Sequence, residues 1–194
     1  MSLYNEIFGM NPYAPELMSI LGLNVEPAKQ FGKLEDLDTP NDLIAFTEEC
    51  KAKNIWPIGR FRDAYVSESD TPGEYCIFVF TRNGGGNRQD YDSIFKILEH
   101  HPNYLSNYDD SFDTTYCYFR FSVPDEFVLR CKEIYKLQPK MIEVGQRFKD
   151  LTQKDWANNQ EDPEVKKTVD VGFKIINAIQ DSMNNTHSSN IIKI

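Results

Sequence analysis

Three runs rich in aromatic and β-branched residues occupy the middle of the chain, and each has the length of a β-strand. They span 58–66, 75–81 and 114–123. In the third run, Phe119 and Phe121 alternate with Tyr118 and Arg120, as in a strand with one core face. The second run is apolar from Tyr75 to Phe80, a pattern typical of a central strand covered on both faces. Turn residues separate the first two runs, which predicts a hairpin within an antiparallel sheet.

Apolar residues at helical spacing predict helices around this sheet. The segment Thr39-Pro40-Asn41-Asp42 combines a capping residue, a proline suited to the first turn and a favourable acidic charge, and its helix is expected to end near Asn54. Shorter helices are expected over 16–21, 90–100 and 124–135, and another from Pro139 to about Trp156. A last helix begins at 162–164, with a stripe of Val165, Val169, Phe173, Ile176 and Met183, before a frayed tail over 184–194.

These elements predict an α+β fold, with a short antiparallel β-sheet of three or more strands packed by helices and a helical C-terminal region. The length of 194 residues suits one domain. We expect a core over 1–157, and a C-terminal helix and tail over 158–194 that pack on it as part of the same domain. The stripe over Val165–Met183 is also compatible with a homo-oligomer.

The charge and the cysteines restrict the classes of partner. The net charge is −9 at pH 7, whereas a protein that follows a nucleic-acid backbone needs a basic face, so direct nucleic-acid binding is not expected. The four cysteines, Cys50, Cys76, Cys117 and Cys131, have no zinc-like spacing and are expected to be reduced core residues. No run of apolar residues is long enough to span a membrane, and the N-terminus lacks a secretory pattern. The expected location is the cytoplasm.

A glycine-rich segment between a predicted strand and a predicted helix is the main candidate for binding a ligand. Three glycines let backbone N–H groups converge on an anion, the following helix N-terminus adds positive potential, and two arginines can contact phosphate. Its residues are Arg82, Asn83, Gly84, Gly85, Gly86, Asn87 and Arg88. The spacing fits neither a P-loop nor a dinucleotide fingerprint. The alternative is a tight turn in which Asn87 caps the next helix.

An acidic segment follows, with Asp109, Asp110 and Asp113 within five residues. Such carboxylates can hold a hard cation such as Mg²⁺, although a solvated acidic loop before the third strand is the favoured interpretation. No cofactor is expected.

The histidines give little basis for catalysis. His100 and His101 are adjacent and so point in different directions on a helix, where they are expected to cap its C-terminal end. The third histidine, His187, lies in the predicted tail, so a nucleophile–histidine pair is hard to assemble. We expect a binding protein and not an enzyme.

Four segments in a fixed order resemble a family of small, mostly uncharacterised bacteriophage proteins. They are Arg60-Phe61-Arg62-Asp63-Ala64-Tyr65-Val66, Thr81 to Arg88, His101-Pro102-Asn103-Tyr104-Leu105 and Asp109-Asp110-Ser111-Phe112-Asp113-Thr114-Thr115-Tyr116. The resemblance covers about a third of the chain. It implies a phage or prophage origin and action in the host cytoplasm, and by analogy a role in blocking host defence and evading immunity.

Three functions compete at this stage. The first is sequestration of a nucleotide-like anionic signal at the glycine-rich segment, where Tyr65, Tyr91 or Tyr116 would stack on a base. The second is an inhibitor whose acidic surface docks on a basic face of a host defence or nucleic-acid-binding protein. The third, ranked well below, is a metal-dependent hydrolase that uses Asp109, Asp110 and Asp113.

Overall fold

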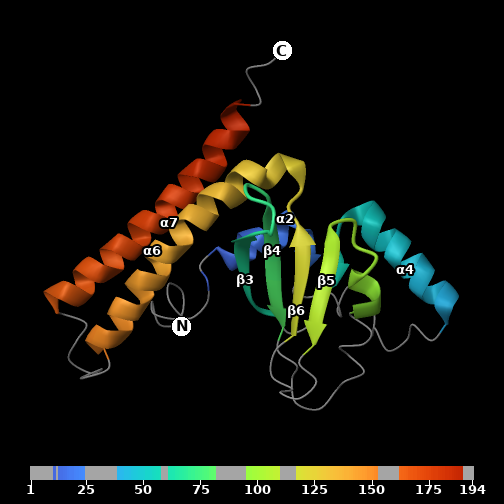
Figure 1. The fold of residues 1–194 in the computed structure, drawn as a ribbon, viewed down its shortest axis with the longest axis horizontal. Helices are drawn as coiled ribbons and strands as arrows, with labels where there is room; N and C mark the ends of the chain where they lie inside the picture. Colours follow the sequence, from blue (N-terminus) through green and yellow to red (C-terminus); the bar gives the residue numbers. More distant parts are fainter. Residues whose placement is uncertain are drawn as a thin grey trace. The chain divides into compact units, whose positions relative to one another are not determined.

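The computed structural model describes residues 11, 13–24, 39–57, 61–81, 95–109, 117–152 and 162–189. It divides into two compact units, one over Ala14–Asp125 and one that holds the chain from Glu126 onward. Figure 1 shows a four-stranded antiparallel sheet in the first unit and a pair of long helices in the second, which is the predicted α+β class with a helical C-terminal region. The predicted packing of 158–194 on a core over 1–157 stays a prediction.

The sheet consists of β3 (Phe61–Glu68), β4 (Tyr75–Thr81), β5 (Tyr104–Asp109) and β6 (Cys117–Ser122). Its order is β3-β4-β6-β5, and every neighbouring pair is antiparallel. The hairpin between β3 and β4 and the bounds of β4 are as predicted. The part of the first predicted strand over 58–60 and the part of the third over 114–116 lie outside the described residues.

β5 was not predicted, because its sequence was assigned to a polar loop. Tyr104–Asp109 contains two tyrosines, one leucine and three polar residues, and it carries no run of aliphatic side chains. Among the described strands, β5 pairs with β6 alone and lies at the edge of the sheet. An edge strand need not be apolar, because it is not enclosed between two neighbours.

In the N-terminal part of this unit, the backbone around Gly22 is in close contact with the backbone around Trp56. We call this contact the Gly22 crossing. Helix α2 (Ala14–Ile20) ends before Gly22, which has a left-handed φ of 64°, and strand β1 (Leu23–Asn24) pairs with β2 (Trp56–Pro57). The backbone N–H of Trp56 donates to the carbonyl of Gly22 at 2.8 Å. The β1–β2 pair brings residues more than thirty positions apart into one small parallel sheet, which the sequence pattern did not indicate.

Helix α4 (Pro40–Lys53) begins and ends where predicted. The Thr39 hydroxyl accepts from the Asp42 backbone N–H at 3.2 Å, and the Asp42 carboxylate accepts from the Thr39 backbone N–H, which forms a complete capping box. Asn54 caps the other end in a left-handed conformation.

The second unit contains the short 3₁₀ helix η2 (Asp125–Phe127) and two long helices, α6 (Val128–Thr152) and α7 (Pro163–Ser189). Figure 1 shows α6 and α7 lying alongside each other. The guanidinium of Arg147 on α6 pairs with the Glu164 carboxylate on α7 at 2.7 Å, with both side chains exposed.

Three predictions about these helices were wrong in detail. Pro139 was expected to separate two helices, but it lies inside α6, where it removes one backbone N–H without ending the helix. The tail expected from Asn184 is helical to Ser189. The buried face of α7 is rotated around the helix axis from the predicted stripe. Phe173 of that stripe is 40% exposed, and the buried positions of the described helix are Val165, Thr168, Gly172, Ile175 and Ile179.

Among the helices of the described part of the chain, none combines the length and the apolar character that crossing a membrane requires.

Candidate ligand-binding face

The residues predicted to bind a ligand lie almost entirely outside the described part of the chain. This applies to Arg82, Asn83, Gly84, Gly85, Gly86, Asn87, Arg88, Tyr91, Tyr116, Asp110 and Asp113. Asp109 is the last residue of β5, and Tyr65 lies within β3. What the structure does describe is where the predicted segments join the sheet.

Both segments join the sheet at the same end. The glycine-rich segment follows Thr81, the last residue of β4, and the acidic segment connects Asp109 of β5 to Cys117 of β6. In the sheet Thr81 is the partner of Cys117, and Cys117 is also the partner of Asp109. Partner Cα atoms in antiparallel strands lie roughly 4.5–5.5 Å apart. The three junctions are therefore neighbours, although the two segments are far apart in the sequence.

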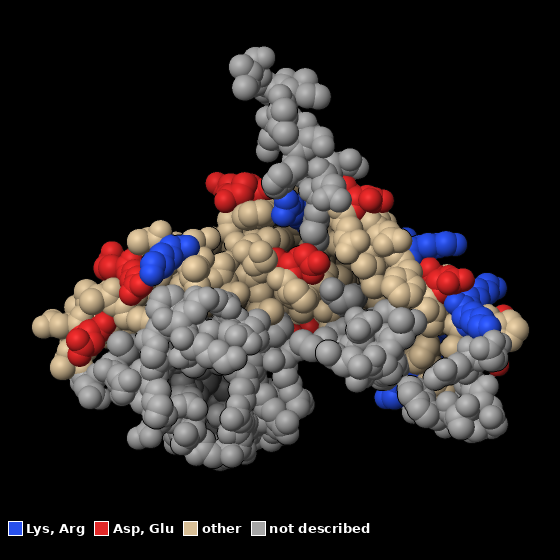
Figure 2. Space-filling view, turned by 180° about the vertical axis from the view of Figure 1, so that it is seen from behind, with Lys and Arg blue, Asp and Glu red and all other residues tan. Residues whose placement is uncertain are grey.

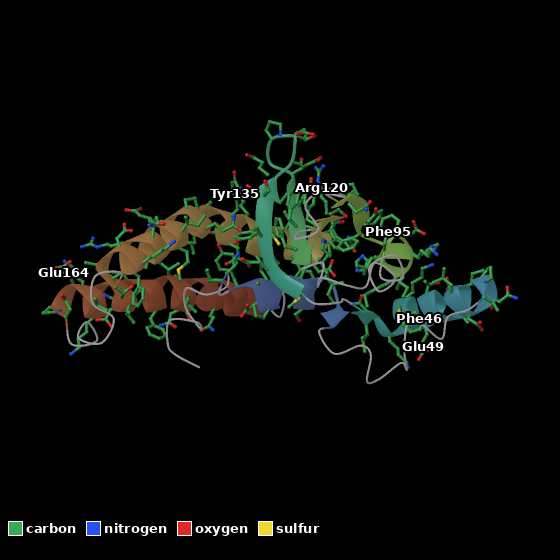
Figure 3. All side chains as sticks on the ribbon, turned by 90° about the horizontal axis from the view of Figure 1, so that it is seen from below. Phe46, Glu49, Phe95, Arg120, Tyr135 and Glu164 are labelled. Carbon is green, nitrogen blue, oxygen red and sulfur yellow. The ribbon has the colours of Figure 1, made fainter. Side chains whose placement is uncertain are left out.

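The two faces of the sheet differ in burial. On the core face, six side chains are almost completely buried: Ala64, Val66, Ile77, Val79, Phe119 and Phe121. The opposite face, which we call the aromatic face, carries Tyr65, Phe78, Phe80, Tyr118 and Arg120, all half-buried. In Figures 1 and 3, α2 lies on one side of the sheet, and Figure 3 shows the Arg120 side chain on the other.

The prediction that β4 is covered on both faces was therefore too strong. β4 is central in the sheet, and Ile77 and Val79 are fully buried, but Phe78 and Phe80 keep part of their surface accessible. Aromatic side chains hold a large apolar surface, so two half-buried phenylalanines on one strand face are available for contact with a flat apolar group.

The rings of the aromatic face contact one another across three strands. Tyr65 and Phe80 meet edge to face with ring centroids 5.6 Å apart. Tyr118 lies 5.6 Å from Phe78 and 5.9 Å from Phe80. Phe80 and Tyr118 are each one residue from the junctions at Thr81 and Cys117. The rings thus form a continuous surface that begins next to the attachment of the glycine-rich segment.

The Tyr65 side chain is hydrogen-bonded to Asp63, two positions earlier on the same strand. Its hydroxyl donates to Oδ2 of Asp63 at 2.5 Å. Burial, followed by this hydrogen bond, raises the pKa of Tyr65, so the phenol stays neutral at physiological pH.

Arg120 lies at the end of the aromatic face that is farther from the junctions at Thr81 and Cys117. Its Nε and Nη2 both lie 3.3 Å from Sγ of Cys76 on β4, and its guanidinium lies over the Phe78 ring, 5.9 Å from the centroid. The hydrogen bonds to Cys76 raise the pKa of Arg120, which is charged in any case. Cys76 itself is buried.

His101 has a structural role that the predicted cap did not anticipate. It is 4% exposed, its Nε2 lies 2.9 Å from the Leu21 carbonyl oxygen, and its Nδ1 accepts from the Asn103 backbone N–H at 3.0 Å. These two partners require a neutral ring protonated on Nε2. Burial lowers the pKa of His101, and the ring contacts Trp56 and Phe121. His101 is therefore fixed in the core, where it contacts Phe121 on the core face of the sheet.

Three of the four cysteines are core residues, as predicted. Cys50, Cys76 and Cys131 are free and buried, and the side chain of Cys117 lies outside the described residues. Within the described residues there is no cluster of three potential metal ligands, and the carboxylates proposed for a cation lie beyond them, so the metal alternative stays untested.

The sequence analysis did not identify Phe78, Phe80 and Tyr118 as members of a candidate site. The signal was present in the alternation of the third strand, which placed Tyr118 and Arg120 opposite the core residues. In β4 the run is apolar throughout, so the sequence did not distinguish Phe78 and Phe80 from core residues, because phenylalanine suits a buried face as well as a binding face.

Comparison with curated proteins gives a significant similarity to a viral protein. Over 128 residues, 63% of this chain, the sequence is 31% identical to a protein of Acanthamoeba polyphaga mimivirus that is described only as uncharacterised. The chain spans about half the length of that relative, 52%. No family model matches the chain, and no solved structure matches it. The α+β protein is thus similar to a viral protein.

Proposed function

We propose that this protein binds a nucleotide-like anion without turning it over, with the base stacked on the aromatic face and the phosphate held by the segment Arg82–Arg88. The observation that carries the proposal is the position of Phe80 and Tyr118. They are half-buried aromatic residues on one face of the sheet, one residue from the strand ends to which the glycine-rich and acidic segments are attached. A phosphate-binding segment and a stacking surface would then be adjacent.

Stacking explains why aromatic residues on this face favour a nucleotide over a simple anion. A base laid on an aromatic side chain contributes about 1–3 kcal/mol, and every base offers a flat face for this contact. The arginines of the glycine-rich segment would supply charge-assisted hydrogen bonds to phosphate, which are stronger than bonds between neutral groups. Binding by these two features needs no acid, base or metal, which favours sequestration over catalysis.

The viral resemblances support the biological role that we propose. The four segments quoted above resemble bacteriophage proteins, and the chain is 31% identical over 128 residues to a mimivirus protein. A viral protein that removes a nucleotide signal from the host cytoplasm would act as a counter-defence protein. This role is part of the proposal and rests on analogy.

The alternative, docking of an acidic surface on a basic partner, has weaker support. The net charge of −9 favours it. However, on the face that Figure 2 presents, the described Lys and Arg side chains lie interspersed with Asp and Glu, and Lys136 pairs with Glu133 at 2.7 Å on α6. Interspersed charges do not make the single-sign patch that steers a charged partner.

The proposal is tested by titrating the full chain with nucleoside monophosphates and triphosphates in a calorimeter. We expect binding, and we expect Tyr118→Ala to weaken it roughly 5- to 100-fold, the loss of one stacking contact. Phe173→Ala is the matched control, since it removes an aromatic ring that is 40% exposed on α7. Arg82→Ala and Arg88→Ala are expected to weaken binding while leaving the melting temperature close to that of the unmodified protein.

Two results would contradict the proposal. One is the absence of binding to any nucleotide. The other is equal affinity of the Tyr118→Ala and Phe173→Ala variants, both shown by circular dichroism to be folded. Native mass spectrometry of protein purified from host cells provides an independent readout. A retained small molecule supports the proposal, whereas a retained host protein without one supports the docking alternative.

A further inference from the structure

The apolar stripe predicted along α7 is only partly buried. Its members Val169 and Ile176 are half-buried, and Phe173 between them is 40% exposed. The three lie on one face of the helix, because residues three and four apart are neighbours on a helix surface. A cluster of accessible apolar side chains marks a contact surface more often than scattered ones do.

This stripe lies outside the contact between α6 and α7, which follows a heptad pattern. Along both helices the buried positions are spaced three and four residues apart, with one interval of seven on α6. They are Cys131, Ile134, Gln138, Met141, Phe148 and Thr152 on α6, and Val165, Thr168, Gly172, Ile175 and Ile179 on α7. A pair of helices needs this seam alone. Apolar residues on and beside the seam are typical of a bundle, in which a helix has neighbours on two sides.

Ile142 extends the stripe from α7 onto α6. The two helices run in opposite directions and are joined by the Arg147–Glu164 pair (Figure 1). Ile142 lies five residues before the first member of that pair, and Val169 lies five residues after the second, so the two are level. Each directly follows a buried residue at the same heptad position, so both lie on the same side of the seam. Ile142 is 63% exposed. We define the Phe173 surface as Ile142, Val169, Phe173 and Ile176.

The net charge of the chain lies entirely in one of its two units. Of the 21 basic and 30 acidic residues, 10 basic and 19 acidic residues belong to the unit over Ala14–Asp125. That leaves 11 of each sign in the unit that contains α6 and α7, so the first unit carries the net charge of −9 and the second carries none. A surface that meets its own copy faces its own charge, and like charges repel. Contact between copies through the helical unit avoids this repulsion, and a strongly basic partner would be attracted to the other unit.

The helix pair is also large enough for a stable contact. α6 has 25 residues and α7 has 27. At about 1.5 Å per residue and a diameter of about 10 Å, one side of the pair measures about 40 Å by about 20 Å, or roughly 800 Å². A standard protein–protein interface buries roughly 800 Å² on each partner. The Phe173 surface lies near the middle of both helices, where the residues that dominate binding are usually found.

We infer that the Phe173 surface binds the same surface of a second copy of this chain, so that two helix pairs form a four-helix bundle around a two-fold axis. The contact is self-complementary, as a two-fold axis requires, because the surface is apolar and its unit carries no net charge. The inference is independent of the proposed function, because the aromatic face belongs to the other unit.

The test measures the mass of the full chain by size-exclusion chromatography with light scattering over a range of concentrations. A single chain has a mass of 22.5 kDa, and we expect about twice that mass at high concentration. Phe173→Glu and Ile142→Glu each place a charge in the contact and should raise the dimer Kd at least about 10-fold. Raising the salt concentration should lower the Kd of the unmodified protein, because salt screens the repulsion between the two acidic units.

Two controls match these variants in exposure and differ in position. Val171 is 39% exposed on the same helix as Phe173, about 200° away around the axis. Leu129 is 63% exposed on the same helix as Ile142, about 140° away. Val171→Glu and Leu129→Glu should leave the Kd unchanged. Circular dichroism establishes that each variant is folded, and Phe173→Ser, which adds no charge, replaces any glutamate variant that is not.

Three results would overturn the inference. The first is a chain that stays monomeric at every concentration. If Phe173→Glu then lowers its melting temperature more than Val171→Glu does, the surface is covered by the chain's own residues. The second is a dimer that Val171→Glu disrupts and Phe173→Glu does not. The third is a dimer that dissociates as salt is added, since opposite charges and not apolar side chains would then hold it together.

Discussion

The imidazole of His101 and the carbonyl of Leu21 are joined by a buried hydrogen bond of 2.9 Å that links positions eighty residues apart. It connects the loop before β5 to the end of α2, and the ring is enclosed by Trp56 and Phe121. Because Nδ1 accepts from the Asn103 N–H, the ring can satisfy both partners only while it is neutral.

This arrangement predicts a loss of stability in mild acid. Burial lowers the pKa of His101 below its ordinary value of 6.5, so the unfolded chain binds a proton that the folded chain resists. The contribution of neutral His101 is complete above about pH 6.5 and is lost as the pH falls below that value. We expect urea melts at pH 7.5 and 5.5 to show a lower free energy of unfolding in acid.

Two variants distinguish the contribution of His101 to the pH dependence of stability from that of the acidic side chains. His101→Asn is expected to reduce the pH dependence, although it lowers stability overall. His100→Gln is the matched control, because the side chain of His100 is 47% exposed next to Glu99, and its removal should leave the dependence on pH unchanged. An equal pH dependence in all three proteins would contradict the role of His101.

The buried thiols predict a pattern of chemical protection. Burial raises the pKa of Cys50 to about 11 and that of Cys131 to about 12. The thiolate is the reactive form, so both residues should resist iodoacetamide at pH 8 while the chain is folded and react when it is unfolded in urea. Mass spectrometry of the alkylated peptides checks this. Modification of Cys131 at the same rate in the two states would show that the residue is not buried.

The sequence predicted the elements whose signal lies within a few neighbouring residues. The capping box of Thr39 and Asp42 and the apolar run of β4 are signals of this kind, and both were recognised. The β1–β2 pair, the edge strand β5 and the buried face of α7 depend on distant partners, and all three were missed or misplaced. The aromatic face has the same origin, because only the register of β3, β4 and β6 shows that Tyr65, Phe80 and Tyr118 are neighbours.

The capping box predicts a measurable contribution to stability from one exposed side chain. Thr39→Ala removes the acceptor for the Asp42 N–H and should cost about 1 kcal/mol. The comparison is Lys136→Ala, which breaks the exposed pair with Glu133 on α6 and should cost no more than about 0.5 kcal/mol. Urea denaturation measures both. A larger loss in Lys136→Ala than in Thr39→Ala would reverse the assigned importance of the two contacts.

The last prediction compares two glycines that share an unusual backbone conformation but differ in their surroundings. Gly22 has a φ of 64° and Gly73 a φ of 85°, so an L-residue is disfavoured at both positions by about 1–2 kcal/mol. A Cβ atom at Gly22 would overlap with the backbone oxygen of Asn54, whereas a Cβ atom at Gly73 would meet nothing within 4 Å. Gly73→Ala should therefore cost the backbone term alone, while Gly22→Ala should cost more, because it forces apart the crossing at which Trp56 donates to Gly22. Chemical denaturation of the two variants measures the difference. Equal losses would mean that the backbone segments at Gly22 and Asn54 can move apart without a loss of stability. The Gly22 crossing would then not stabilise the N-terminal part of the unit.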